Sequence, residues 1–187
     1  MTRSRSASIT FTASLIFALA CFAAETGDTP RHAANGSLLF PSDYREWVFL
    51  SSGLGMTYGP AATPGTPRFD NVFVTRAAYK AFVDTGHWPD NTMFVLEIRN
   101  ATSEGSINKG GHFQTGISAI EVEVKEKGKW TFYGFPKGEE SEGKAFERTA
   151  TCYACHGTNG AVDNTFVQFY PTLLPIAKAK GVLKAEK

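Results

Sequence analysis

The residues best suited to chemistry lie late in the chain, in the segment Cys152-Tyr153-Ala154-Cys155-His156. This is the pattern C-x-x-C-H, the attachment signature of c-type haem. Two cysteines three positions apart share one helical turn, so each thiol can add to a haem vinyl group, and the next residue can place an imidazole on the iron. The motif therefore predicts one covalently attached haem c, with Cys152 and Cys155 as thioether attachments and His156 as an iron ligand.

Three other uses of the motif stay open. A zinc site needs four ligands, but the expected second ligand pair is missing, since His32, His87 and His112 stand alone. A thioredoxin-type redox pair follows the first strand of a parallel βαβ unit, whereas this motif comes late in the chain. A disulfide across so short a span gains little loop-closure entropy. Haem attachment is favoured because it uses all three specified residues.

The residue on the other side of the iron would decide the function. Electron-transfer cytochromes fill that position with Met or His, but the 31 residues after the motif contain neither. Upstream, Met56 lies in a Gly- and Pro-rich loop and Met93 lies near a strand start. Each is a possible ligand, as are the three other histidines, but a lone Met more often fills a core. We therefore expect an open iron position that can bind a small molecule such as NO.

The beginning of the chain has the layout of an export signal. Two arginines precede an apolar run over residues 9–24 that ends in small residues. This pattern predicts a signal peptide over residues 1–24, with cleavage after Ala23 or Ala24. Lipid attachment at Cys21 is an alternative that the preceding residues support only loosely. The expected location is outside the cytoplasm, where c-type haem is attached.

Composition limits the remaining possibilities. The chain has 187 residues, of which 42% are hydrophobic and 20% are charged, with a net charge of +1. These values suit one globular domain and give no electrostatic reason to expect nucleic acid or an anionic membrane surface as a partner. After the signal, no apolar run is long enough to span a membrane. We expect a flexible lead-in over residues 25–40 and a single haem domain over residues 41–187.

Hydrophobic patterns predict an α+β fold with an antiparallel sheet of about five strands. A helix is expected at Arg76–Asp84, because Thr75 can cap it and Gly86 can end it. Residues 53–67 form a predicted loop, and further helical segments near the C-terminus carry the haem motif. The expected strands are 47–50, 71–74, 92–98, 117–124 and 130–135.

Three stretches of the sequence resemble the cytochrome P-460 family. They are Asp43 to Val48, Ala78 to Gly86, and the haem motif followed by Phe166 to Pro171. The resemblance implies a mostly antiparallel sheet packed against a c-type haem, in a periplasmic homodimer. It also implies thioether and axial-ligand roles for the two cysteines and the histidine of the motif.

One position departs from the hydroxylamine-oxidising members of that family. Those members carry a haem-linked lysine on the strand after the mid-chain helix, and counting from Gly86 puts that position at Leu96. The nearest lysines, Lys80 and Lys109, lie outside this strand. The sequence is therefore more similar to the branch without the cross-link, cytochrome c'-beta, which binds NO and CO under an apolar cap. Hydroxylamine oxidation and simple electron transfer remain the alternatives.

Strand periodicity extends this expectation to neighbouring residues. If Leu96 faces the haem, Phe94 and Ile98 lie on the same face and Glu97 points away. An apolar pocket of this kind suits a neutral diatomic gas better than a substrate that needs proton transfer. The alternative is that these residues are ordinary sheet core.

The C-terminal part of the chain contains a group of aromatic residues and a group of lysines. Phe166, Phe169 and Tyr170 are expected to pack around the haem or in a dimer interface. A basic tail is expected to be a solvated helix end or a docking surface for an acidic redox partner. This tail contains Lys178, Lys180, Lys184 and Lys187.

Overall fold

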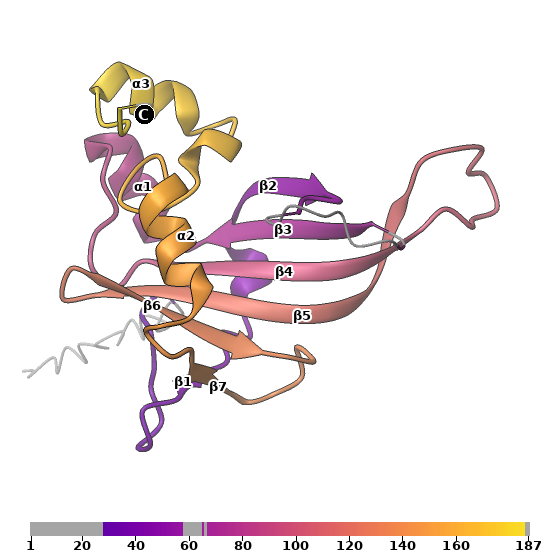
Figure 1. Ribbon diagram of the computed structural model, residues 1–187, viewed down its shortest axis with the longest axis horizontal. Helices are drawn as coiled ribbons and strands as arrows, with labels where there is room; N and C mark the ends of the chain where they lie inside the picture. The colour runs from indigo at the N-terminus through magenta and orange to yellow at the C-terminus, as the bar shows by residue number, and fades with distance from the viewer. Residues whose placement is uncertain (1–27, 58–64, 66, 186–187) are drawn as a thin grey trace, which may run out of the picture.

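The computed structural model describes residues 28–57, 65 and 67–185. The expected export signal, which includes Cys21, and Lys187 therefore lie outside the described residues. Most of the loop expected at 53–67 lies outside them as well. Within them, seven strands form one antiparallel sheet in the order β1-β7-β6-β5-β4-β3-β2, with helices packed on one face (Figure 1). The elements are β1 Leu38–Leu39, η1 Tyr44–Glu46, β2 Val48–Leu54, β3 Arg68–Val74, α1 Arg76–Thr85, β4 Met93–Thr102, β5 Phe113–Glu126, β6 Lys129–Phe135, β7 Glu142–Ala145, α2 Thr151–Asn159, η2 Val167–Phe169 and α3 Leu174–Lys180.

The expected α+β class is confirmed, and the sheet has two strands more than predicted. The five expected strands correspond to β2 through β6. The two additional strands, β1 and β7, pair through Leu38↔Gly143 and Leu39↔Glu142. Both are too short to show a period-two pattern, so only the paired backbone reveals them.

The described part of the expected lead-in, residues 28–40, contains strand β1, which was not predicted. Leu38 is fully buried, and the backbone N–H of Leu39 donates to the carbonyl oxygen of Arg31 at 2.8 Å. A single buried leucine fixes this segment to the sheet edge, a tertiary effect that local composition does not reveal. The predicted start of the following loop also differs, because β2 continues through Gly53 to Leu54.

Local turn chemistry explains two of the connections. Gly86 ends α1 with a left-handed φ of 83°, and its N–H donates to the carbonyl oxygen of Phe82 at 2.7 Å. The β5–β6 hairpin turns at Lys127 and Gly128, whose φ angles of 50° and 72° are both positive. A two-residue hairpin of this kind matches the right-handed twist of the strands it joins. The end of the helix at Gly86 was predicted from this residue.

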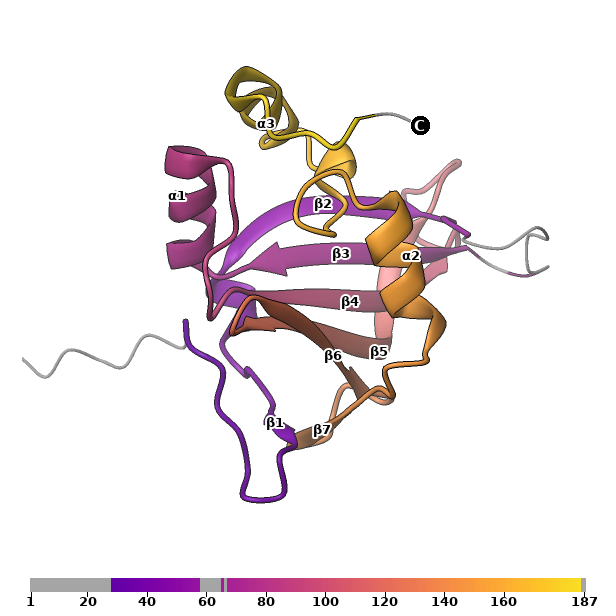
Figure 2. The same cartoon turned by 60° about the vertical axis from the view of Figure 1, so that its left-hand side comes forward.

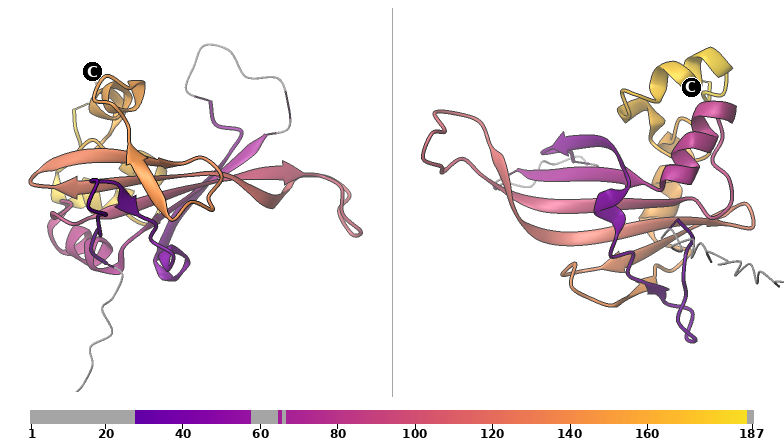
Figure 3. Two further views of the ribbon diagram at one scale, coloured as in Figure 1. Left: turned by 90° about the horizontal axis from the view of Figure 1, so that it is seen from below. Right: turned by 180° about the vertical axis from the view of Figure 1, so that it is seen from behind.

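The alternation along each strand gives the sheet two unlike faces. The helix-bearing face packs Val74 and Phe94 against α1, α2 and the C-terminal segment (Figure 2). The opposite face packs Met93 and Val95 with Tyr44 of η1, which lies on that side (Figure 3, right). Neighbouring residues of β4 therefore belong to different hydrophobic clusters, so each face can be changed separately.

The connection between β4 and β5 projects beyond the rest of the sheet (Figure 1). Ile107 in this connection is 91% exposed, and Lys109 and His112 are exposed as well.

No helix in the described part of the chain is long and apolar enough to cross a membrane.

Candidate functional site

Helix α2 carries the C-x-x-C-H motif and lies across the helix-bearing face of the sheet (Figure 2). Cys152 and Cys155 are one turn apart, both are free thiols, and both are partly buried. Cys152 packs against the hydrophobic cluster of this face. Burial raises the pKa of the Cys152 thiol. The two sulfur atoms are therefore placed at the boundary between the helix and the apolar face, where a covalently held ligand could be covered.

The C-terminal end of α2 is held by side chains from later in the chain. The Lys184 ammonium donates to the carbonyl oxygen of Gly157 at 2.7 Å, and the Gln168 amide donates to that of Asn159 at 2.8 Å. Lys180 similarly donates to the carbonyl oxygen of Asp84 in α1 at 2.8 Å. These lysines satisfy carbonyl groups that a helix end leaves without intrahelical partners. Two residues of the predicted basic tail therefore have structural contacts.

His156 is oriented by a backbone carbonyl group. Its Nδ1 lies 3.0 Å from the carbonyl oxygen of Asn164, so the N–H is assigned to Nδ1. The other ring nitrogen, Nε2, is directed at β5, where it lies 3.4 Å from Oε1 of Glu123. Burial lowers the pKa of His156, although the Asn164 hydrogen bond opposes this shift. A neutral imidazole with Nδ1 so engaged is the form that binds a metal through Nε2.

Aromatic rings surround the imidazole. The ring of Phe132 on β6 lies 4.7 Å from the His156 ring, and Phe166 lies 4.4 Å from it, both measured between centroids. Tyr170 is buried and stacks on Phe94 at 6.1 Å, while Phe169 remains partly exposed. Of the three aromatic residues after the motif, Phe166 therefore lies beside the proposed iron ligand.

The strand β4 supplies an apolar floor beside α2. Phe94 is buried on the helix-bearing face, and Leu96 and Ile98 follow at period two with partial exposure. Leu96 pairs with Val72 of β3, which is also only partly buried. Three aliphatic side chains with partial exposure next to a helix bearing two thiols form a surface on which a flat apolar macrocycle could pack.

Carboxylates also lie on this face, and their positions in the sequence did not mark them as site residues. Glu123 and Glu121 of β5 are the cross-strand partners of Phe94 and Leu96, and Asp70 of β3 is the partner of Ile98. Burial raises the pKa of Glu123 to about 8, and the nearby charge of Glu121 adds to the shift. Burial and the charge of Asp70 also raise the pKa of Glu121. The face that holds Phe94 and Leu96 therefore also carries three carboxylates, which the expectation of an apolar pocket did not include.

The alternating pattern of β5 conceals these carboxylates. In β5 the acidic residues alternate with Ile120, Val122 and Val124, and this pattern normally marks a solvent-facing side. Here that side is covered by α2. The local pattern of β5 does not distinguish a side that a helix covers from a side that faces solvent.

The other possible axial ligands have contacts elsewhere. Met93 is buried in the opposite face, and Met56 lies beside Gly53 near the end of β2. His32 Nε2 lies 3.2 Å from Glu126, and His87 Nδ1 lies 3.5 Å from Asp163. His112 is exposed in the β4–β5 connection. None of these five is joined to His156 by a contact among the described residues.

The lysines nearest to Leu96 in sequence are also placed away from β4. Lys80 on α1 forms an ion pair with Asp84 at 2.7 Å, and Lys109 is exposed in the projecting connection. Leu96 therefore occupies a position on the helix-bearing face without a lysine on the same strand. Glu97 lies on the opposite face, where it contacts Tyr44.

The donor set and its surroundings fit a haem. Two uncombined thiols lie one turn apart, an imidazole presents Nε2, and aromatic and aliphatic side chains surround them. Together with the antiparallel sheet, this site defines a haem cytochrome of α+β architecture. A family model described as Cytochrome P460 matches residues 41–167, and the chain belongs to that family. No curated protein matched the chain.

Proposed function

We propose that the protein is an exported monohaem c-type cytochrome that binds NO or a related small nitrogen oxide at an open iron position. In this proposal Cys152 and Cys155 hold the haem through thioether bonds, and His156 is its iron ligand. The bound haem would supply an iron centre able to coordinate a diatomic gas. The family membership supports the haem itself, and the motif supports its covalent attachment.

The arrangement of His156 is the observation that carries the proposal. Its Nδ1 donates to the Asn164 carbonyl, which leaves Nε2 as the coordinating nitrogen on the side of the sheet. Met93 is directed to the opposite face, so the methionine of β4 is poorly placed to act as a second ligand. Phe94 and Leu96 would restrict the space available and favour a small neutral ligand.

Spectroscopy of the exported, ferrous protein tests the proposal. Absorption and resonance Raman spectra are recorded before and after addition of NO. We expect a five-coordinate ferrous haem that changes its spectrum when NO is added. A six-coordinate, low-spin spectrum before any gas is added would contradict the open position. The absence of covalently bound haem in the intact mass would contradict the whole proposal.

Hydroxylamine oxidation is a second candidate, favoured by one observation. Glu121 and Glu123 lie on the same face as the proposed haem ligand and could accept protons released from a substrate. Leu96, in place of a cross-linking lysine, argues against this activity. Turnover of hydroxylamine with an electron acceptor, reduced at least tenfold by Glu121→Gln, would favour the second candidate over gas binding.

Electron transfer without a ligand-binding role is the third candidate. It requires a methionine or histidine at the second axial position, and it predicts a Met-type absorption band that is lost in a variant such as Met56→Ala. A periplasmic location, a homodimer and a redox partner protein belong to the proposal as well. Fractionation of cells and sedimentation of the purified holoprotein test the location and the oligomeric state.

A further inference from the structure

The carbonyl group that orients His156 belongs to a turn with an unusual backbone. Asp163 and Asn164 have positive φ angles of 47° and 62°. Thr165 closes the turn, since its N–H and its hydroxyl both donate to the carbonyl oxygen of Val162, at 2.8 and 2.7 Å. Two consecutive left-handed residues other than glycine are unfavourable and persist only when surrounding contacts hold them.

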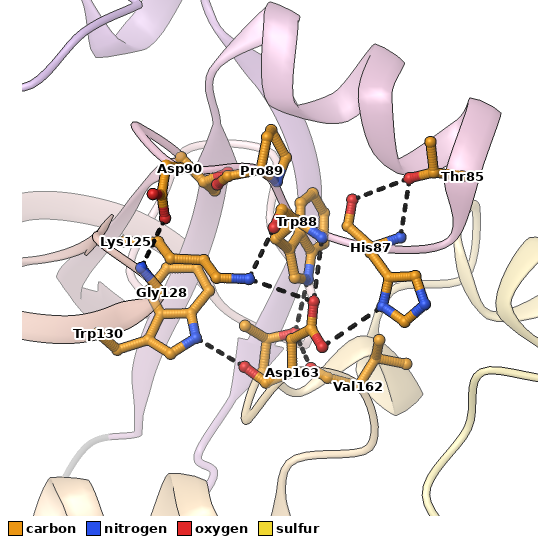
Figure 4. Close-up of polar contacts among 12 residues, drawn as sticks. Thr85, His87, Trp88, Pro89, Asp90, Lys125, Gly128, Trp130, Val162 and Asp163 are labelled. Atoms are coloured by element: carbon orange, nitrogen blue, oxygen red, sulfur yellow. Dashed lines mark hydrogen bonds and ion pairs between the residues drawn. The ribbon is translucent and has the colours of Figure 1, made fainter.

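The Asp163 side chain receives contacts from two other parts of the fold (Figure 4). Its Oδ2 accepts the backbone N–H of Trp88 at 3.1 Å and lies 3.4 Å from the Lys125 ammonium of β5. Its Oδ1 lies 3.5 Å from Nδ1 of His87. One carboxylate therefore joins the turn to the α1–β4 connection and to the central sheet.

Two tryptophans complete the attachment. Trp130 of β6 donates its indole N–H to the carbonyl oxygen of Asp163 at 2.7 Å, and buried Trp88 donates its indole N–H to the Thr165 hydroxyl at 2.9 Å. Lys125 also donates to the Trp88 carbonyl at 2.7 Å (Figure 4). The turn is thus held along its length, and the Asn164 carbonyl is left directed at His156.

We propose that Asp163 is a positioning residue for the iron ligand, which acts through the Asn164 carbonyl to fix the orientation and the basicity of His156. This inference rests on the proposed function, in which His156 binds the haem iron. The partner of a ligating imidazole normally sets its tautomer and tunes the metal. Here that partner is a backbone carbonyl, so its position depends on whatever holds the turn.

The strength of the hydrogen bond from His156 should affect the iron in a defined direction. A strong hydrogen bond from Nδ1–H makes the imidazole a better electron donor, which strengthens the iron–nitrogen bond and favours the oxidised metal. A loosened turn weakens that hydrogen bond. The iron–histidine stretching frequency should then fall, and the midpoint potential should rise.

The test uses exported holoprotein and two independent ways to loosen the turn. Asp163→Ala removes the carboxylate, and Trp130→Phe removes the indole donor while keeping an aromatic ring. Asp163→Asn keeps an oxygen for the Trp88 N–H but loses the charge opposite Lys125. Asp90→Ala is the matched control, because Asp90 accepts the Gly128 N–H at 2.8 Å in the neighbouring loop (Figure 4).

Resonance Raman spectra of the ferrous protein and redox titrations give the readouts. We expect a lower iron–histidine frequency and a higher potential in Asp163→Ala and Trp130→Phe, a smaller change in Asp163→Asn, and none in Asp90→Ala. Unchanged spectra and potential in Asp163→Ala and Trp130→Phe, even with lower stability, would overturn the inference. A parent protein without covalent haem or without a histidine ligand would instead contradict the proposed function.

Discussion

The two faces of the sheet treat buried carboxylates in opposite ways. On the opposite face, Glu97 of β4 is only 1% exposed, yet its oxygens accept hydrogen bonds from several donors. On the helix-bearing face, Glu121 and Glu123 of the adjacent strand β5 lie beside Leu96 and Phe94. The same type of side chain is therefore ionised by one environment and disfavoured as an ion by the other.

The contacts of Glu97 explain its charge. Asn71 donates to it at 3.1 Å, the Arg45 guanidinium lies at 2.6 Å, and the Tyr44 hydroxyl and Arg99 also donate to it. Burial opposes ionisation, but these hydrogen bonds and charges outweigh burial and lower the pKa of Glu97 to about 2. A buried charge with this many donors stabilises one register of β3 and β4.

The difference between the two faces indicates which carboxylates are available for chemistry. In the Glu97 network the donors are paired with the Glu97 carboxylate, so these groups stabilise the fold. The carboxylates beside α2 have raised pKa values because burial is not offset in the same way. Groups of this kind are typical of sites that bind or transform a ligand. This difference supports our proposal that the helix-bearing face is the functional one.

The largest expected effect comes from removing the thiols of the helix-bearing face. In the double variant Cys152→Ala, Cys155→Ala, no thioether can form, so we expect complete loss of covalently bound haem. Mass spectrometry of the denatured protein measures this loss as the missing mass of one haem. The matched control is His112→Ala, which alters an exposed histidine and should retain full haem content. Haem retained in the double variant would contradict the proposed attachment.

Much of this arrangement could be predicted from the sequence, because local signals were strong. Thr75 and Gly86 indicated the ends of α1, and alternation indicated that Phe94 and Leu96 share a face apart from Glu97. The motif indicated the position of the candidate site. These features depend on residues close together in the chain.

The rest depends on contacts between distant residues. The pairing of β1 with β7 joins residues about 100 positions apart, and no local period marks either strand. The burial of Glu121 and Glu123 requires α2 to cover β5, which the alternating pattern of β5 contradicts. The Asn164 carbonyl is a backbone group, so no residue type indicates its role.

A matched pair of substitutions tests whether the carboxylates of the two faces contribute differently to stability. Glu97→Gln leaves Arg99 and Arg45 without a carboxylate, and removing one partner of a buried charge network costs about 3 to 5 kcal/mol. Glu121→Gln replaces a carboxylate whose ionised form burial disfavours, so we expect a change below about 1 kcal/mol. Urea denaturation of both holoproteins measures the free energies of unfolding. Equal losses in the two variants would show that the faces do not differ.

Acid should destabilise the protein through the same network. The pKa of Glu97 is lowered from 4.5 to about 2, so the folded state binds its proton less readily than the unfolded state. This contribution, about 3 kcal/mol, is fully present above about pH 5 and is lost as the pH falls toward 2. Denaturation curves at a series of pH values measure the loss. Glu97→Gln should show a flatter profile in that interval, and an unchanged slope would contradict the assignment.

The smallest expected effect separates the faces at adjacent residues of one strand. Leu96→Ala shortens a side chain on the helix-bearing face and should speed CO association with the ferrous protein by about tenfold, equivalent to about 1.4 kcal/mol. Val95→Ala is the matched control, because Val95 is fully buried in the opposite face. We expect it to lower stability by about 1 to 3 kcal/mol through the cavity it leaves, without changing the CO rate. Flash photolysis measures the rates, and urea denaturation measures the stability. An equal change of the CO rate in Val95→Ala and Leu96→Ala would contradict this assignment. It would show that the effect of Leu96→Ala does not arise from its position on the helix-bearing face.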